Sequence, residues 1–233
     1  MLFFFDSPAG IALMILSFII AAAAQMGVKR TFHKYAKQTV SSNLTGASVA
    51  TMMVQDTGVS VIESRGGHLS DHFDPRKKVI ALSPDVYHGK TVSALGVAAH
   101  EAGHALQYDQ GYVPIKVRNS FLPVAQIGSY AAMPLILIGL FAGAGEMRFL
   151  IDIGILCLVV ALMFQVFTLP VELNASRRAI AILDRDGYLA PSEMVGAKAV
   201  LRAAALTYVA AIVTAILQIV RLVLISRGGG RRR

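Results

Sequence analysis

Two histidines stand four residues apart in the stretch Val97–Gln107, and a glutamate directly follows the first of them. On a helix, His100 and His104 would lie on one face about one turn apart, so that both imidazoles could reach a single ion. Glu101 would then lie beside that ion. Two neutral nitrogen ligands, an open position for water and a carboxylate that takes the proton of that water are typical of a zinc hydrolase.

The rest of the chain is mostly apolar, and this composition indicates whether such a helix belongs to a soluble protein or to a membrane protein. Of its 233 residues, 55% are hydrophobic and 15% are charged, a balance too apolar for an ordinary soluble domain. Four almost uncharged runs are each close to the ~20 residues that cross a bilayer as a helix, at about residues 8–26, 121–145, 149–170 and 203–225. We therefore expect a mostly α-helical integral membrane protein with four transmembrane helices, in which residues 1–233 form a single domain.

The first apolar run could also be a cleaved signal peptide, because Ala21–Ala24 resembles a small-residue cleavage site. A signal peptide requires a positively charged start, however, and the residues before this run contain no Lys or Arg. This favours an uncleaved anchor. Cys157 is the single cysteine and lies inside the third run, which excludes a disulfide within the chain.

The net charge of +8 indicates orientation in the membrane before it indicates a partner. With four spans, segments 29–120 and 171–202 lie on one side of the membrane, and both are rich in Lys and Arg. The positive-inside rule places that side in the cytoplasm, although the arginines of the tail, Arg227 and Arg231–Arg233, disagree. The lipid bilayer is therefore an expected partner, and nucleic acid is not.

The polar segment 29–120, between spans one and two, is predicted to hold the metal-binding helix and a small β-sheet. A helical stretch at residues 44–56 ends at Thr57-Gly58, and Val59–Glu63 alternates as a strand does. A turn at residues 65–67 precedes a second strand at residues 78–82, which Ser83-Pro84 ends. We therefore expect a small sheet followed by a zincin-like active-site helix.

A catalytic zinc usually has three protein ligands, so a third residue is needed. One class of zinc enzyme has a third histidine six residues after the second, but Gln110 occupies that position. The other histidines and the acidic residues remain, and among them we favour Glu172, where the third span ends and a helix at residues 171–186 begins. Two spans separate Glu172 from His104 and return the chain to the same membrane face. The alternative is an interfacial carboxylate at a helix amino terminus.

Four stretches together resemble the YugP-type neutral zinc metallopeptidases of bacterial membranes, over nearly the whole chain: Val97–Gln107, Leu169–Ala179, Asp71–Arg76 and Leu82–Tyr87. The resemblance implies a gluzincin-like enzyme of the bacterial cell membrane. More distantly, the chain is similar to the HtpX and CAAX-prenyl endopeptidase families. In those families the third zinc ligand is a Glu after a membrane hairpin, and an Asp follows it four residues later.

Glu172 matches that Glu, but Ser176 stands where the Asp would be. The group that orients a zinc-binding histidine therefore stays open, and Asn174, Asp109 and Asp71 are the alternatives.

The residues and the resemblance together predict a membrane-embedded zinc metalloendopeptidase. Zn²⁺ would be held by His100, His104 and Glu172, and Glu101 would act as the general base. A peptide or a membrane protein would be the substrate. A donor for the oxyanion is expected among Arg177, Tyr87 and His88. We also predict that an exposed edge strand pairs with the extended substrate, and that this strand consists of Val79, Ile80, Ala81 and Leu82.

Other functions fit the sequence less well. A catalytically idle zinc-binding scaffold, which would recruit or regulate an unidentified membrane partner, would not need Glu101. A transporter has little support because Asp152 is the one acidic residue within spans two to four. A polar cluster that follows Gly66-Gly67 could bind a second metal, but a solvated turn is the simpler interpretation, and its members are His68, Asp71, His72 and Asp74.

Overall fold

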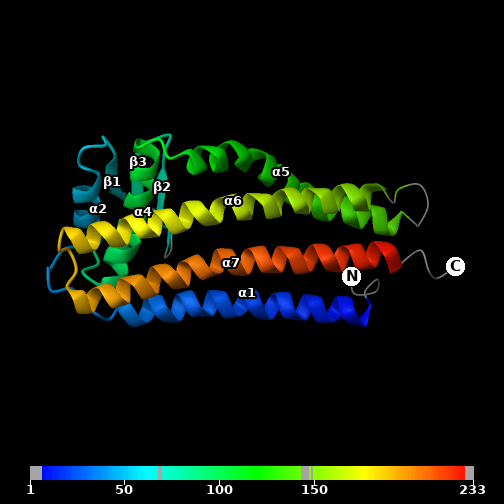
Figure 1. The fold of residues 1–233 in the computed structure, drawn as a ribbon, viewed down its shortest axis with the longest axis horizontal. Coiled ribbons are helices and arrows are strands. Elements are labelled where there is room, and N and C mark those ends of the chain that lie inside the picture. Colours follow the sequence, from blue (N-terminus) through cyan, green and yellow to red (C-terminus); the bar gives the residue numbers. More distant parts are fainter. Residues whose placement is uncertain (1–6, 68–69, 143–146, 148, 229–233) are drawn as a thin grey trace. The chain divides into compact units, whose positions relative to one another are not determined.

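The computed structural model describes residues 7–67, 70–142, 147 and 149–228. Figure 1 shows the elements that these residues form: α1 (Pro8–Tyr35), α2 (Gly46–Val54), β1 (Ser60–Glu63), β2 (His72–Asp74), β3 (Val79–Leu82), α3 (Pro84–Tyr87), α4 (Val92–Asp109), α5 (Val113–Phe141), α6 (Phe149–Arg185) and α7 (Pro191–Gly228). Four of the described helices, α1, α5, α6 and α7, are long and apolar enough to cross a membrane. The expectation of a mostly α-helical membrane protein with a small β-sheet is confirmed.

The chain forms two compact units. The expectation that residues 1–233 form a single domain stays a prediction. The membrane unit comprises residues 1–24, 117–169 and 207–233, and the polar unit comprises residues 25–116 and 170–206. Four helices, α1, α5, α6 and α7, run from one unit into the other. The residues of the predicted metal site all belong to the polar unit, whereas Arg231–Arg233 lie outside the described residues.

The helix that carries Glu172 does not begin at residue 171, as we expected from Pro170. Instead, α6 continues through that proline from Phe149 to Arg185. A proline inside a helix removes one backbone hydrogen bond, but tertiary packing can outweigh this loss. Residues on one face of α6 are fully buried at intervals of four, and this packing continues the helix beyond the apolar span: Val171, Ala175, Ala179 and Leu183.

The sheet of the polar unit has the strand order β1-β3-β2. β1 pairs with β3 in parallel, with Ser60 opposite Val79, and β2 pairs with β3 antiparallel, with Phe73 opposite Ile80. The sequence predicted β1 and β3 but missed the short strand β2. β3 is the central strand, and its residues Ile80, Ala81 and Leu82 are buried.

Local capping interactions fix the start and the end of α4, the helix that bears the two histidines. Thr91 is its N-cap, and the Thr91 hydroxyl accepts a hydrogen bond from the backbone N–H of Ala94 at 3.3 Å. After the last turn, Gly111 adopts a left-handed conformation with φ of 65°, which glycine allows without strain. His100 and His104 therefore lie in the middle of α4, where the helical backbone is rigid.

Candidate metal centre

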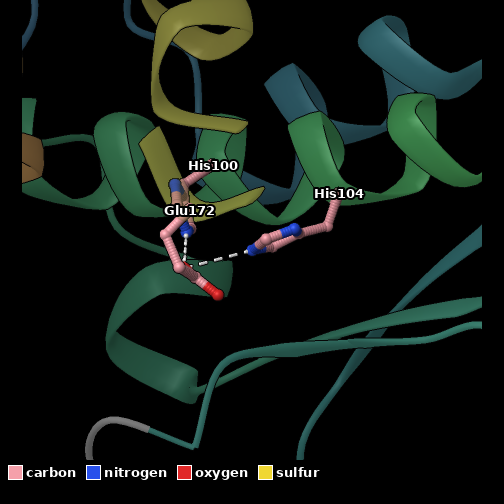
Figure 2. A group of neighbouring side chains, drawn as sticks. All are labelled: His100, His104 and Glu172. Carbon is pink, nitrogen blue, oxygen red and sulfur yellow. Dashed lines mark hydrogen bonds and ion pairs between the residues drawn. The ribbon is translucent and has the colours of Figure 1, made fainter. Parts of the chain in front are cut away.

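Three side chains with metal-binding atoms meet between α4 and α6. Figure 2 shows His100 and His104 of α4 directing their rings at Glu172 of α6. The Nε2 atoms of His100 and His104 lie 3.3 and 3.4 Å from the same oxygen, Glu172 Oε2. The side chains of the three residues are 16%, 10% and 4% exposed, in the same order. Among the described residues, this is the one group of three such side chains close enough to hold an ion.

The spacing of these atoms fits a metal ion better than it fits a direct hydrogen bond. N–H···O hydrogen bonds usually measure about 2.7 to 3.2 Å, and both contacts to Glu172 Oε2 are longer. Two ligands that each lie about 2.1 Å from a tetrahedral zinc ion are about 3.4 Å apart. Two imidazole nitrogens and one carboxylate oxygen are also a donor set that catalytic zinc sites use. The residues therefore fit a zinc ion in both spacing and chemistry.

A glycine allows α4 and α6 to approach each other at this point. A Cβ atom added to Gly103 would lie 2.6 Å from the backbone oxygen of Ala175 and 3.3 Å from its Cα. Real Cβ atoms do not approach so closely, so only glycine fits. Gly103 directly precedes His104, and Ala175 lies one turn after Glu172, so this contact places the ligands of the two helices beside one another.

Hydrogen bonds on the far side of each ring orient the two histidines. His104 Nδ1 lies 3.0 Å from Gln107 Oε1, and His100 Nδ1 lies 3.1 Å from Ser176 Oγ. Each Nε2 atom is therefore left facing Glu172. Such outer partners are expected of metal-binding histidines. Ser176 thus contacts a histidine from the position four residues after Glu172.

Gln107 was not predicted as a partner of His104. Asn174 is one of the three residues that were expected to orient a zinc-binding histidine. It reaches His104 indirectly, by accepting a hydrogen bond from Gln107 Nε2 at 2.9 Å. Asp71 instead accepts hydrogen bonds from Ser83. The signal for Gln107 was its spacing, because a residue three positions after His104 lies on the same face of a helix.

The electrostatic surroundings of His104 favour a cation. Burial lowers the pKa of His104, but its contact with the Glu172 carboxylate and the negative charges of Glu101 and Glu172 outweigh burial, so the pKa is raised. A metal ion would compete with a proton for the same nitrogen. Glu101 is half-buried and follows His100 directly on α4.

The three predicted oxyanion donors lie elsewhere. Arg177 is exposed on α6 and lies about 140° around the helix from Glu172. His88 Nε2 lies 3.1 Å from Glu63 Oε2, and its ring contacts that of Tyr87 edge-on. Among the described residues, no hydrogen bond or ion pair joins Arg177, Tyr87 or His88 to the metal cluster, so the role of an oxyanion donor stays a prediction.

The prediction that Val79–Leu82 forms an exposed edge strand is wrong. These residues form β3, whose backbone pairs with β1 on one side and with β2 on the other. The sequence contained the reason, because a continuous apolar run is typical of a central strand, whereas a strand with one solvated face alternates. The free edges belong to β1 and β2. β2 lies beside α4, where the rings of Phe73 and Tyr108 meet edge-on at 6.0 Å.

The described members of the polar cluster after Gly67 lie directly before β2 and within it, and a turn follows at residues 75–78. His68 lies outside the described residues. Asp71 Oδ1 accepts hydrogen bonds from the backbone N–H of Ser83 at 2.7 Å and from its hydroxyl at 3.0 Å. Burial raises the pKa of Asp71 despite these hydrogen bonds. Asp74 Oδ1 accepts from the backbone N–H groups of Arg76 and Lys77. Asp71 therefore holds the backbone directly after β3, and Asp74 holds the turn directly before it.

The fold and the site define an integral membrane protein with a histidine and glutamate metal centre, and comparison with known proteins gives its family. The family model described as "Putative neutral zinc metallopeptidase" matches residues 10–227. The "Putative membrane protease YugP" of Bacillus subtilis (strain 168) is 41% identical over 208 residues, which cover 88% of this chain and 91% of that protein. No solved structure matches the chain. The chain belongs to this neutral zinc metallopeptidase family.

Proposed function

We propose that the protein is a membrane-embedded zinc metalloendopeptidase. One observation carries this proposal: a single carboxylate oxygen of Glu172 lies at nearly equal distances from the Nε2 atoms of His100 and His104, beside the half-buried Glu101. The family description and the printed name of the Bacillus subtilis relative support peptide bonds as the substrate.

The side chains of the site have different roles in hydrolysis. His100, His104 and Glu172 would hold the zinc ion, which polarises the scissile carbonyl and lowers the pKa of a water molecule. Glu101 accepts the proton of that water and passes it to the leaving nitrogen. Because Glu101 lies on the same rigid helix as the two histidines, its distance from the reacting water is fixed by the backbone of α4.

The substrate would lie as an extended strand along the free edge of β2. A sheet edge offers unpaired backbone groups to a peptide, and β2 is the edge strand that contacts α4. A cavity of about 640 Å³ at the start of α4 provides room for a side chain, and its lining includes Phe32, His33 and Ser93. Ser93 is seven residues before His100 and lies on the same face of α4.

The test compares the wild-type protein with Glu101→Gln, which keeps the shape of the side chain and removes the base. We expect one zinc ion per chain in both proteins, and peptide hydrolysis should fall by about 10² to 10⁴ in the variant. Asp109→Asn is the matched control, because Asp109 is an exposed acid on the same helix. It should keep both zinc and activity.

Two results would contradict the proposal. Unchanged hydrolysis by Glu101→Gln would exclude this residue as the general base. A wild-type protein that binds zinc but cleaves neither peptides nor membrane proteins would instead support the idle scaffold.

A further inference from the structure

A chain of hydrogen bonds leads from an arginine on α6 to His104 on α4. Arg178 Nε donates to Asn174 Oδ1 at 2.8 Å. Gln107 Nε2 donates to the same Asn174 oxygen at 2.9 Å, and Gln107 Oε1 lies 3.0 Å from His104 Nδ1. Gln107 is fully buried, so water does not compete for its contact with His104.

The direction of every hydrogen bond in this series follows from its first residue, Arg178. A guanidinium has donors and no acceptor, so the atom of Asn174 that faces Arg178 must be the oxygen. That oxygen can only accept, so the atom of Gln107 that faces it must be the amide nitrogen. The oxygen of Gln107 is thereby turned toward His104, and His104 Nδ1 must carry the hydrogen.

A second and independent contact fixes the same orientation of Gln107. Its Nε2 also donates to the backbone oxygen of Val171 at 2.8 Å, and a backbone carbonyl is an acceptor under all conditions. A flipped amide would place two oxygens against the Gln107 oxygen and lose both hydrogen bonds. Val171 directly precedes Glu172, so this contact also ties the amide to the backbone of the third ligand.

We propose that Gln107, Asn174 and Arg178 are positioning residues that keep His104 in one tautomer, with Nδ1 protonated and the lone pair of Nε2 directed at the metal site. They act through His104 and do not touch the reacting atoms. Arg178 is itself held at the end of α4, because its Nη1 atom donates to Gln110 Oε1 and its guanidinium lies 5.7 Å from the centre of the Tyr112 ring.

Among the described residues, no comparable chain of hydrogen bonds fixes the tautomer of His100, so His100 serves as an internal reference. Its Nδ1 faces the hydroxyl of Ser176, and a hydroxyl can donate or accept. The Ser176 contact therefore permits either tautomer of His100, whereas the Gln107 contact permits one tautomer of His104. Substitutions in the chain of hydrogen bonds should change His104 and leave His100 as it is.

The first measurement is zinc affinity of the purified full-length protein, by competition with a chromophoric chelator. Gln107→Met keeps the approximate shape of the side chain without its polar atoms, and Asn174→Leu does the same at the next position. Each should weaken zinc binding by about tenfold, the lower end of the effect of outer partners of metal ligands. Tenfold corresponds to about 1.4 kcal/mol.

Conservative and neighbouring variants separate this role from simple packing. Asn174→Asp retains an acceptor oxygen for both Arg178 and Gln107, so it should stay near the wild-type affinity. Arg178→Gln should weaken zinc binding, whereas Arg177→Gln removes an adjacent exposed positive charge and should not. Equal effects of the two arginine variants would mean that charge alone is responsible.

The second measurement needs no metal. In metal-free protein labelled with ¹⁵N-histidine, at alkaline pH, the ring nitrogen shifts of His104 should report a hydrogen on Nδ1 in the wild type and in Asn174→Asp. Gln107→Met should show a mixture of tautomers at His104 and no change at His100.

The inference rests on the proposed metal site for the affinity measurement alone. A wild-type protein without zinc affinity would refute the proposed function, and the tautomer measurement would still decide this inference. If Gln107→Met and Asn174→Leu both keep the Nδ1–H tautomer of His104, the inference is wrong.

Discussion

The two halves of α6 pack against their neighbours in different ways. In the membrane unit, the first half of α6 contacts α5 through apolar and small residues. The rings of Phe121 and Phe167 meet edge-on at 5.7 Å, and a Cβ atom added to Gly154 would lie 2.5 Å from Ile136 Cγ1. The hydroxyl of Thr168 donates within its own helix, to the backbone oxygen of Phe164.

In the polar unit, the second half of α6 contacts α4 through an equally close approach, at Gly103 and Ala175. Here, however, side chains also form hydrogen bonds between the two helices. Gln107 of α4 donates to Val171 and Asn174, and Ser176 of α6 contacts His100.

The difference shows which interactions a metal site requires. Small residues bring helices close together in both halves, but dispersion between apolar surfaces has little directional preference. Hydrogen bonds have preferred lengths and angles, so they fix the rotation of one helix against another. A site with three ligands must be held to within about 0.5 Å. Where α6 carries a metal ligand, the chain therefore combines close packing with directed bonds.

The largest effect should come from removing the metal ligand in the second half of α6, which lies in the polar unit and is called the polar half below. Glu172→Ala should weaken zinc binding by more than about 100-fold, because loss of a ligand should exceed the 10- to 100-fold effect of outer partners. Zinc affinity by chelator competition measures this.

Glu193→Ala is the matched control for that prediction. Glu193 is another buried carboxylate of the polar unit, but its oxygens accept from the backbone N–H groups of Ser41 and Ala190, at 2.7 and 2.8 Å. Its removal should lower the free energy of unfolding and leave zinc affinity unchanged. Full zinc affinity in Glu172→Ala would refute the third-ligand assignment.

A smaller effect should follow when the ligand remains but its helix is displaced. Gly103→Ala would place a methyl group 2.6 Å from the backbone oxygen of Ala175, so α4 and α6 must separate. We expect zinc affinity to fall by about 10- to 100-fold, since misplacement by ~1 Å has effects of this size.

Two other glycines test whether this effect belongs to the polar half. Gly154→Ala crowds α5 against α6 in the membrane unit and should lower stability without changing the zinc affinity of folded protein. Gly27→Ala meets nothing within 4 Å and should change neither quantity. A loss of zinc affinity in Gly154→Ala equal to that in Gly103→Ala would contradict the separation of roles between the two halves.

The parts of the site that depend on local pattern were predictable from the sequence. His100, Glu101 and His104 follow from their spacing on one helix, and the membrane helices follow from apolar runs of sufficient length. Glu172 could be reached because an even number of crossings returns the chain to one face. None of these steps requires knowledge of how α4 packs on α6.

The parts that depend on long-range contacts were not predictable. β2 has three residues, His72, Phe73 and Asp74, and exists because β3 offers it a pairing edge. The role of Gln107 requires Val171 and Asn174, which are more than 60 residues away in the sequence. Pro170 indicated a helix end, but the buried face that continues α6 past it is a tertiary effect. A single sequence shows periodicity and does not show which distant residues meet.

The smallest perturbation tests the topology on which the polar half depends. Because α5 and α6 both cross between His104 and Glu172, the polar segments before and after them must share one membrane face. Single cysteines are introduced by Ser42→Cys, Ser192→Cys or Ala142→Cys in a Cys157→Ala background. All three positions are exposed in their own units, so the substitutions should leave zinc affinity unchanged.

We expect residues 42 and 192 to resist a membrane-impermeant thiol reagent in intact cells, because the excess of Lys and Arg would retain their segments in the cytoplasm. Residue 142, at the end of α5, should react. If residues 42 and 192 both react and residue 142 does not, the orientation is inverted, yet the metal ligands still share a face. If only one of residues 42 and 192 reacts, an odd number of spans separates His104 from Glu172. The metal centre could not then form, and the close contact of α4 with the second half of α6 would be wrong as well.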